Sequence, residues 1–206
     1  MTSALWFVAA YLCGAFPTSY LAGKLLRGID LREHGSKNLG ATNVYRVMGL
    51  GIAVPVALID ILKGAVPVWL FAPALSDSLT TALLLGAMAI VGHVFSIFVG
   101  FKGGKGVATA TGVMLGLVPA AIGVSIVVWL VTVAITRFVS LGSILGALVL
   151  APAVWLLHAD RRELVPFCAL VALAIIVFHR ANIGRLRRGT ESRVGRKSTA
   201  TPGAAA

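Results

Sequence analysis

Long, continuous apolar runs are the feature that most limits what this chain can fold into. The chain has 206 residues, of which 58% are hydrophobic and 12% are charged, whereas about 25% of residues are charged in an average soluble domain. Several runs approach the roughly 20 apolar residues that a helix needs to cross a bilayer. Lipid permits only helices or closed barrels, and the runs do not alternate as barrel strands do. The sequence therefore predicts an all-α integral membrane protein.

We expect about seven transmembrane helices, at residues 3–25, 50–72, 78–100, 106–119, 120–137, 139–157 and 163–179. Two alternatives remain for residues 106–137, namely two spans or one long span that is broken near Pro119. With seven spans, 15 Lys and Arg residues fall on one face, and only Arg161 and Arg162 fall on the other. The positive-inside rule prefers this asymmetry to the even split that six spans give. The N-terminus is then expected outside and the C-terminus in the cytoplasm.

The net charge of +11 lies mainly in these loops and in the C-terminal segment. A membrane topology explains this charge, so nucleic acid is not an expected partner. Residues 1–189 are expected to form a single polytopic domain with its active site at the cytoplasmic face, and 190–206 a basic, disordered cytoplasmic tail. Leu5–Ala15 lacks a basic leader and a small-residue cleavage site, so it is expected to be a retained helix and not a signal peptide.

A basic, glycine-rich segment follows the third expected span. Residues 101–106 read Phe-Lys-Gly-Gly-Lys-Gly. Glycines let the backbone approach a ligand, their N–H groups can form an anion-binding concavity, and lysines add positive charge. The segment lacks the spacing of a nucleotide-binding P-loop. We therefore expect a phosphorylated substrate at the membrane surface rather than a nucleoside triphosphate.

Further polar residues lie in the loop after the first span, at residues 30–46. Hydroxyl and amide side chains in this loop can pair with a polyol phosphate, and Arg46 can bind a phosphate through two hydrogen bonds. The same residue types are also typical of ordinary turns, so both interpretations stay open. Asp60 and Lys63 are three residues apart, which predicts a buried ion pair on one helix face. His93 is either functional or a helix-packing group.

Two more polar groups come later in the chain. Ser140 and Ser143 share a helix face, which is more typical of close helix packing than of a binding site. His179, Asn182 and Arg185 are spaced by three, which predicts one face of a helix that continues out of the last span.

Five of these segments, in order, resemble the bacterial acyl-phosphate:glycerol-3-phosphate acyltransferase (PlsY) family over residues 10–193. The matching stretches are Gly35-Ser36-x-Asn38-x-Gly40-Ala41-Thr42-Asn43, Asp60-x-Leu62-Lys63-Gly64, Gly92-His93-x-Phe95, Phe101 to Thr109, and His179-Arg180-x-Asn182-Ile183. The chain departs from the family at Ser96, where proline is usual, at Lys37, where glycine is frequent, and at Arg193, where lysine is common.

The resemblance implies a seven-helix, multi-pass enzyme of the bacterial inner membrane. Such an enzyme transfers the acyl chain of an acyl-phosphate to the 1-hydroxyl of sn-glycerol-3-phosphate, giving lysophosphatidic acid and phosphate in the first step of membrane phospholipid biosynthesis. The expected partners are the two substrates and membrane lipids, and an enzyme that supplies acyl-phosphate is a further candidate. No cofactor and no metal are expected. A transporter for an anionic metabolite is the alternative function.

The resemblance also implies roles for individual residues. The catalytic candidates are Ser36, His93, Lys105 and His179. The acyl-phosphate is expected to be held by Lys102, Gly103, Gly104, Lys105, Gly106 and Thr109. Glycerol-3-phosphate is expected to be held by Ser36, Asn38, Thr42, Asn43, Arg46, His179 and Asn182. Supporting roles fall to Asp60, Lys63, Arg185 and Glu191. The general base is open between His179, His93 and a phosphate oxygen of the substrate.

Overall fold

Helices account for all the regular secondary structure in the part of the chain, residues 2–195, that the computed structural model describes. Each of the seven predicted runs contains a helix close to the expected residues. The elements of the first half are α1 (Thr2–Ala15), α2 (Thr18–Arg27), α3 (Ala41–Met48), α4 (Leu50–Val66), η1 (Pro67–Phe71), α5 (Ala72–Leu75), α6 (Leu79–Val94) and η2 (Ile97–Val99). Those of the second half are α7 (Val107–Leu117), α8 (Pro119–Thr136), α9 (Val139–Leu157), η3 (Ala159–Leu164), α10 (Val165–Phe178) and α11 (Arg180–Arg187).

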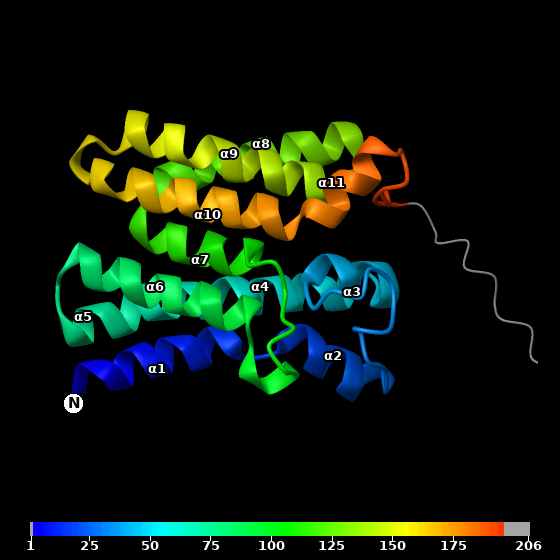
Figure 1. Cartoon of the computed structure of the whole chain (residues 1–206), viewed down its shortest axis with the longest axis horizontal. Coiled ribbons are helices and arrows are strands. Elements are labelled where there is room, and N and C mark those ends of the chain that lie inside the picture. Colours follow the sequence, from blue (N-terminus) through cyan, green and yellow to red (C-terminus); the bar gives the residue numbers. More distant parts are fainter. Residues whose placement is uncertain (1, 196–206) are drawn as a thin grey trace, which may run out of the picture.

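The long helices form two groups with a short helix between them (Figure 1). In that view α1, α4 and α6 run together in the lower half and α8, α9 and α10 in the upper half, with α7 between the groups. Helix α7 packs on α4, α1 packs on α6, and α9 packs on both α8 and α10. Any site between the two groups therefore draws its side chains from distant parts of the sequence.

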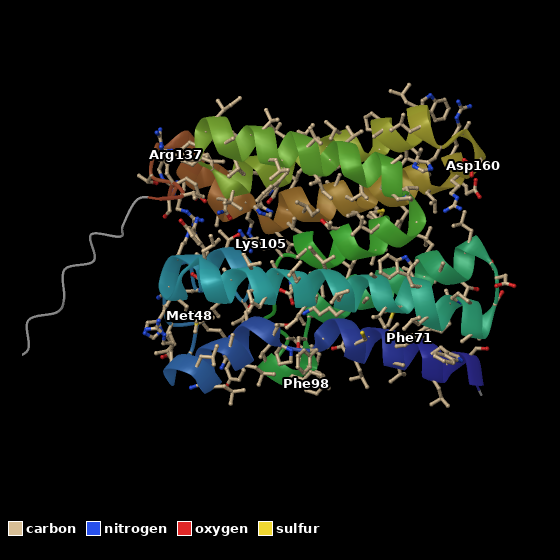
Figure 2. All side chains as sticks on the ribbon, turned by 180° about the vertical axis from the view of Figure 1, so that it is seen from behind. Met48, Phe71, Phe98, Lys105, Arg137 and Asp160 are labelled. Carbon is tan, nitrogen blue, oxygen red and sulfur yellow. The ribbon has the colours of Figure 1, made fainter. Side chains whose placement is uncertain are left out.

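The basic segments gather at one end of the molecule. Figure 1 shows α2, α3 and α11 at this end and the N-terminus and α5 at the opposite end. Figure 2 places Arg137 and Met48 at the same basic end and Asp160 at the other. This arrangement agrees with the predicted division of charge, and which end faces the cytoplasm stays a prediction.

Four helical stretches in residues 2–195 are long and apolar enough to cross a membrane, or up to six if each of two bent helix pairs is one span. The fourth predicted span, 106–119, corresponds to α7, which has only 11 residues. The count of seven therefore stays a prediction. Residues 106–137 form two helices, because Val118 leaves the helical conformation with φ −144° and ψ 65°, and both alternatives for this stretch, two spans or one broken span, stay open. Pro119 then starts α8, where its missing N–H has no cost.

A break near Pro17 divides the first span into α1 and α2, which are bent by 42°. The carbonyl groups at the end of α1 have no partner within their own helix, and lipid would offer none. The Ser96 hydroxyl donates to the carbonyl of Ala15, and the Lys63 ammonium donates to that of Phe16 at 2.8 Å. Ser96, one of the departures from the family pattern, therefore has a structural role in this chain.

Glycines allow the closest helix contacts. A Cβ added at Gly112 on α7 would overlap the carbonyl oxygen of Ile61 on α4, and one added at Gly64 on α4 would overlap the carbonyl oxygen of Thr109. A Cβ added at Gly92 on α6 would likewise overlap the carbonyl oxygen of Tyr11 on α1. Small residues let membrane helices approach in this way and gain van der Waals contact.

Candidate active site

A polar pocket of about 110 Å³ opens among α3, α7, α9 and the junction of α10 and α11. Figure 2 shows Lys105 between the two helix groups near the basic end. The pocket brings together eleven of the predicted site residues: Ser36, Asn38, Thr42, Asn43, Arg46, Asp60, His93, Lys105, Gly106, His179 and Asn182. Val107, Ala108, Ser140 and Ser143 complete most of its wall.

Lys105 is the central cation of this pocket. Its ammonium group donates a hydrogen bond to the side-chain oxygen of Asn182. Burial disfavours the charged form and lowers the pKa of Lys105 to about 8, although the nearby Glu191 carboxylate opposes the shift. A cation that is partly desolvated in this way binds an anionic oxygen more strongly than a surface lysine does.

Glu191 holds the basic side of the pocket together. It is 6% exposed, and its carboxylate accepts hydrogen bonds from Asn182 at 2.8 Å and from Arg185 at 2.6 Å. Ser140 donates at 3.0 Å, and Arg46 forms an ion pair at 3.5 Å. Burial alone would raise the pKa of Glu191, but these hydrogen bonds bring it below its ordinary value. Glu191 thus stays charged and orients Arg46 and Asn182 at the pocket.

The contact to Glu191 corrects two expectations. Ser140 was expected to serve helix packing, yet its hydroxyl binds this carboxylate. Glu191 falls in the range assigned to a disordered tail, yet it is buried, and the backbone N–H of Val194 donates to the carbonyl of Arg137 at 2.8 Å. Residues 196–206 lie outside the described part of the chain, so the prediction of a disordered tail now concerns them alone.

His179 lies at the end of α10, where the chain bends by 59° into α11. The predicted continuous helix face through Asn182 and Arg185 is therefore wrong, although His179 and Asn182 still reach the same pocket. The Nδ1 atom of His179 lies 2.8 Å from the carbonyl oxygen of Ile175. A carbonyl only accepts hydrogen bonds, so Nδ1 carries the proton. Neutral His179 then keeps a lone pair on Nε2 and can accept a proton there.

The first polar loop lines the opposite wall. Ser36, Asn38 and Thr42 border the pocket. Asn43 borders it too, but its side chain is already bonded: the oxygen accepts from the Ser36 N–H at 2.7 Å, and the nitrogen donates to the carbonyls of Leu31 and His34. We therefore assign Asn43 to holding the loop and not to holding the substrate. The segment from Ala41 onward, expected as a loop, is the short helix α3.

The expected phosphate cradle at Gly103 and Gly104 is not in the pocket. Their N–H groups donate to the carbonyls of Val94 and His93 at 3.0 and 3.1 Å, so both donors are occupied. Gly104 also packs so closely against the His93 ring that a Cβ there would overlap it. These two glycines satisfy carbonyl groups at the end of α6. The small size of Gly104 allows the His93 ring to fit against the loop.

The start of α7 provides the N–H groups instead. Gly106 lines the pocket with φ +83°, a conformation that favours glycine, and Val107 and Ala108 follow it on the pocket wall. The first N–H groups of a helix have no partner within the helix, and the N-terminus carries partial positive charge. Of the predicted cradle, Lys105 and Gly106 thus line the pocket, and the first turn of α7 stands where Gly103 and Gly104 were expected.

Two other expected phosphate ligands lie elsewhere. Lys102 is exposed and does not line the polar pocket. Thr109 is fully buried, and its backbone packs against Gly64 on α4. Neither residue therefore lines the polar pocket.

A buried charged group lies under the pocket. Asp60 and Lys63 form the predicted ion pair at 2.7 Å, and Nδ1 of His93 lies 3.9 Å from the same Asp60 oxygen. Asp60 and His93 border the pocket, whereas Lys63 reaches the carbonyl of Phe16 at the α1 break. Asp60, Lys63 and His93 therefore connect the polar pocket to the break between α1 and α2. Within residues 2–195, no cluster of three His, Cys, Asp or Glu residues is arranged to hold a metal ion.

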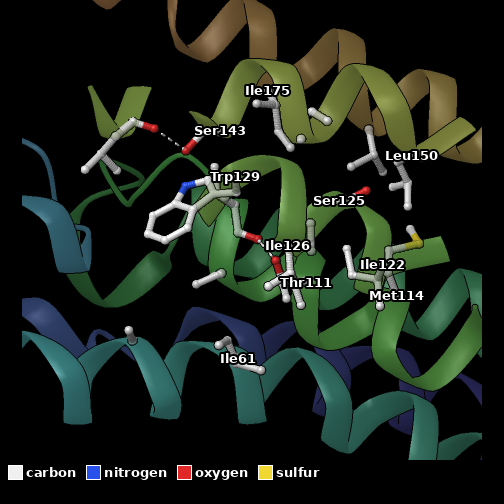
Figure 3. Close-up of a pocket in the computed structure, with 18 of the residues that line it drawn as sticks. Ile61, Thr111, Met114, Ile122, Ser125, Ile126, Trp129, Ser143, Leu150 and Ile175 are labelled. Atoms are coloured by element: carbon white, nitrogen blue, oxygen red, sulfur yellow. Dashed lines mark hydrogen bonds between the residues drawn. The ribbon is translucent and has the colours of Figure 1, made fainter. Parts of the chain in front are cut away.

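An apolar cavity of about 270 Å³ adjoins the polar pocket. Figure 3 shows Trp129 and Ser143 at one end of this cavity and Met114, Ile122 and Leu150 at the other. The two spaces share lining residues, namely Ala41, Thr42, Val107, Ala108, Val139 and Ser143. The cationic pocket and the apolar cavity thus adjoin along these six residues.

The comparison with known proteins accounts for this arrangement. A family model described as glycerol-3-phosphate acyltransferase matches residues 4–189. The chain belongs to the glycerol-3-phosphate acyltransferase family. The glycerol-3-phosphate acyltransferase of Chlorobaculum tepidum is 43% identical over 93% of this chain and 97% of its own length. That of Geobacter sulfurreducens is 45% identical over 89% of this chain and 93% of its own.

Solved structures agree with this family. The crystal structure of PlsY, described as an integral membrane glycerol 3-phosphate acyltransferase in its glycerol 3-phosphate form, matches with a TM-score of 0.86 and 35% identity, covering 95% of this chain and 96% of that one. The lysophosphatidic acid form of PlsY matches with a TM-score of 0.83. The predicted family and the all-α, multi-pass membrane fold are confirmed, and an acyltransferase is favoured over a transporter.

Sequence reasoning missed the apolar half of the site of this glycerol-3-phosphate acyltransferase. Its walls come from helices that read as ordinary membrane spans, and the polar motifs gave no sign of it. A signal was present in the small residues Ala108, Ala110, Gly146 and Ala147, which leave space beside larger neighbours. Small residues in membrane helices equally indicate close packing, so only the packed structure separates the two meanings.

Proposed function

We propose that this protein transfers the acyl chain of an acyl-phosphate to the 1-hydroxyl of glycerol-3-phosphate, giving lysophosphatidic acid and inorganic phosphate for membrane phospholipid synthesis. The observation that carries the proposal is the union of the polar pocket and the apolar cavity. An acyl-phosphate has a charged head and a long apolar chain, and the two adjoining spaces supply a polar and an apolar part in the same order.

The acceptor fits the side of the pocket that Glu191 organises. Arg46 can bind the phosphate of glycerol-3-phosphate through two hydrogen bonds. Ser36, Asn38 and Thr42 line the facing wall and can hydrogen-bond the glycerol hydroxyls. His179 and Asn182 border the same space. Together these groups would hold the 1-hydroxyl toward the mouth of the apolar cavity.

The donor fits the start of α7. Its phosphoryl group would lie against Lys105 and the first N–H groups of α7, and its chain would enter the cavity between α7 and α9. Thr42, Ala108 and Ser143 line both spaces, so the acyl carbonyl would lie near them. The reacting carbonyl carbon and the acceptor hydroxyl then meet at the boundary between the two environments, which is the positioning the reaction needs.

The reaction is a direct displacement at the acyl carbon. The 1-hydroxyl oxygen of glycerol-3-phosphate forms a bond to the carbonyl carbon, and the bond from that carbon to the phosphate oxygen breaks. Phosphate leaves with the bonding electrons, and the hydroxyl proton moves to a base. Lys105 and the N–H groups of α7 stabilise the charge that develops on the leaving phosphate. The mixed anhydride is already activated, so no acyl-enzyme is required.

Two proton acceptors fit this geometry. The Nε2 atom of His179 carries a free lone pair in the neutral ring, and a phosphate oxygen of a substrate can also take the proton. His93 is a weaker candidate, because its ring is enclosed by Gly104 and Asp60. His179→Asn would remove the basic nitrogen while keeping a polar group. A loss of the acidic limb in the pH profile of kcat would assign the base to His179, and an unchanged limb would assign it to the substrate.

Acyl transfer by the purified protein in lipid nanodiscs tests the proposal. Radiolabelled glycerol-3-phosphate is offered with palmitoyl-phosphate, palmitoyl-CoA or palmitoyl-acyl-carrier protein in separate reactions. We expect lysophosphatidic acid from palmitoyl-phosphate alone. Product from one of the thioesters and none from palmitoyl-phosphate would contradict the proposed donor, while no product from folded protein would contradict the activity itself.

A further inference from the structure

The far end of the apolar cavity is closed by large side chains of the protein core. Met114 and Leu150 are 0% and 3% exposed, and Ile122 is also buried. All three belong to the core cluster between α7, α8, α9 and α10, and Met114 lies 4.0 Å from the sulfur of Cys168 behind it. A chain that enters from the polar pocket therefore meets packed side chains at this end.

The length of the cavity follows from the helix that forms one wall. On α9, Val139, Ser143, Ala147 and Leu150 line it in turn, and Val139 also borders the polar pocket. Leu150 is eleven positions after Val139, which corresponds to about 16 Å along the helix axis. The same order appears in Figure 3, where Ser143 and Leu150 mark opposite ends of the cavity.

The walls between these ends suit an alkyl chain. The Thr111 hydroxyl donates to the carbonyl of Val107 at 3.0 Å, and the Ser143 hydroxyl donates to that of Val139 at 3.0 Å. These hydroxyl groups are thus satisfied by their own helices and need no polar ligand. Ala147 and Gly146 keep the middle of the cavity wide. A methylene chain can pass these two hydroxyl groups without leaving either of them unpaired.

We propose that Met114, Ile122 and Leu150 form a stop that sets the longest acyl chain the enzyme uses efficiently, and that Ala147 keeps the path to this stop open. The proposal rests on the proposed function and adds to it a determinant of donor specificity. A chain one or two carbons too long would press against these side chains and draw its own carbonyl away from the acceptor. An interior methylene in an apolar pocket typically changes specificity by about tenfold or more.

Donor-length profiles test this stop. Values of kcat/KM are measured with decanoyl- to eicosanoyl-phosphate for the wild type and for Leu150→Ala, Met114→Ala, Ala147→Leu and Leu148→Ala. Leu148→Ala is the matched control, because it makes the same change two residues from Leu150 at a side chain that is 48% exposed on the outer face of α9. Thermal unfolding in nanodiscs shows which variants are folded.

If these side chains form a stop, substitutions that enlarge the cavity and substitutions that fill it should shift the preferred donor length in opposite directions. Leu150→Ala and Met114→Ala should raise the ratio of kcat/KM for the longest donors to that for the wild-type optimum by about tenfold. Ala147→Leu should move the optimum to shorter chains, and Leu148→Ala should keep the wild-type profile. A folded Leu150→Ala or Met114→Ala that changes all donors by one common factor would overturn the proposal. Failure of the wild type to use any acyl-phosphate would instead overturn the proposed function on which it rests.

Discussion

The ammonium group of Lys105 donates a hydrogen bond to the side-chain oxygen of Asn182, 77 residues later in the sequence. This contact joins the start of α7 to α11. Asn182 in turn donates to Glu191, which binds Arg46 on α3. Lys105 and Arg46, the cations that we propose bind the two phosphate groups, are therefore placed by one connected network, and its parts can be tested separately.

Lys105→Ala should reduce kcat by about 10² to 10³-fold, the usual cost of removing a group that stabilises transition-state charge. The side chain lies at the pocket and does not support the core, so the thermal unfolding temperature should stay near that of the wild type. Initial rates of lysophosphatidic acid formation provide the measurement. Lys102→Ala is the matched comparison, because Lys102 is exposed outside the pocket. A loss of activity for Lys102→Ala as large as that for Lys105→Ala would contradict the assignment.

The pH dependence of the free enzyme should follow Lys105. Its pKa is lowered to about 8 by burial, and a lysine is charged below its pKa. The value of kcat/KM for the donor should fall tenfold for each pH unit above about pH 8, where Lys105 loses its proton. Arginine stays charged over this range, so in Lys105→Arg the remaining activity should lose this alkaline fall. An alkaline fall of equal position in Lys105→Arg would assign it to another group.

Glu191→Gln should weaken binding of glycerol-3-phosphate. Arg46 and Arg185 lose their anionic partner while the shape of residue 191 is kept. We expect a rise in KM for glycerol-3-phosphate and a loss of about 1–3 kcal/mol of stability. Because the Glu191 carboxylate raises the pKa of Lys105, the alkaline limb should also move to lower pH. Glu163→Gln, at an exposed residue of η3, is the control and should change none of these.

Gly112→Ala should destabilise the contact between α4 and α7. The added Cβ would overlap the carbonyl oxygen of Ile61, and backbone atoms cannot give way as a flexible side chain can. Overpacking of this kind costs about 1–3 kcal/mol. Gly123→Ala on α8 makes the same change where nothing lies within 4 Å. Thermal unfolding of the two variants in parallel gives the comparison, and equal unfolding temperatures would show that the α4–α7 contact tolerates the methyl group.

The sequence was sufficient for most of the membrane fold, because hydropathy fixes where helices can cross lipid. Residues 139–157 were predicted as a span and form α9 with the same ends. The partners of backbone N–H groups in the loops could not be predicted from hydropathy. Gly103 and Gly104 looked like free donors in the sequence, but their N–H groups close the end of α6. Only the path of the chain decides whether a glycine N–H faces a ligand or a carbonyl.

The polar site was predictable as a set of residues, and less so as a set of roles. Asn43 and Asn182 are the same residue type in matching motifs, yet Asn43 holds its own loop while Asn182 contacts Lys105. The difference depends on neighbours that are distant in sequence. The apolar cavity lay beyond prediction for the same reason, since Ala147 on α9 and Met114 on α7 come to line one cavity only in the folded chain.

Short donors of increasing length test most directly the central claim that the polar pocket and the apolar cavity form one site. Values of kcat/KM for acetyl-, butyryl-, hexanoyl- and octanoyl-phosphate are measured at known free donor concentrations. Each methylene that enters the cavity should add about 0.8 kcal/mol, or about fourfold in kcat/KM. A steady rise of this size from acetyl- to octanoyl-phosphate is the predicted result. A flat profile would show that the chain does not occupy the cavity and would contradict the account.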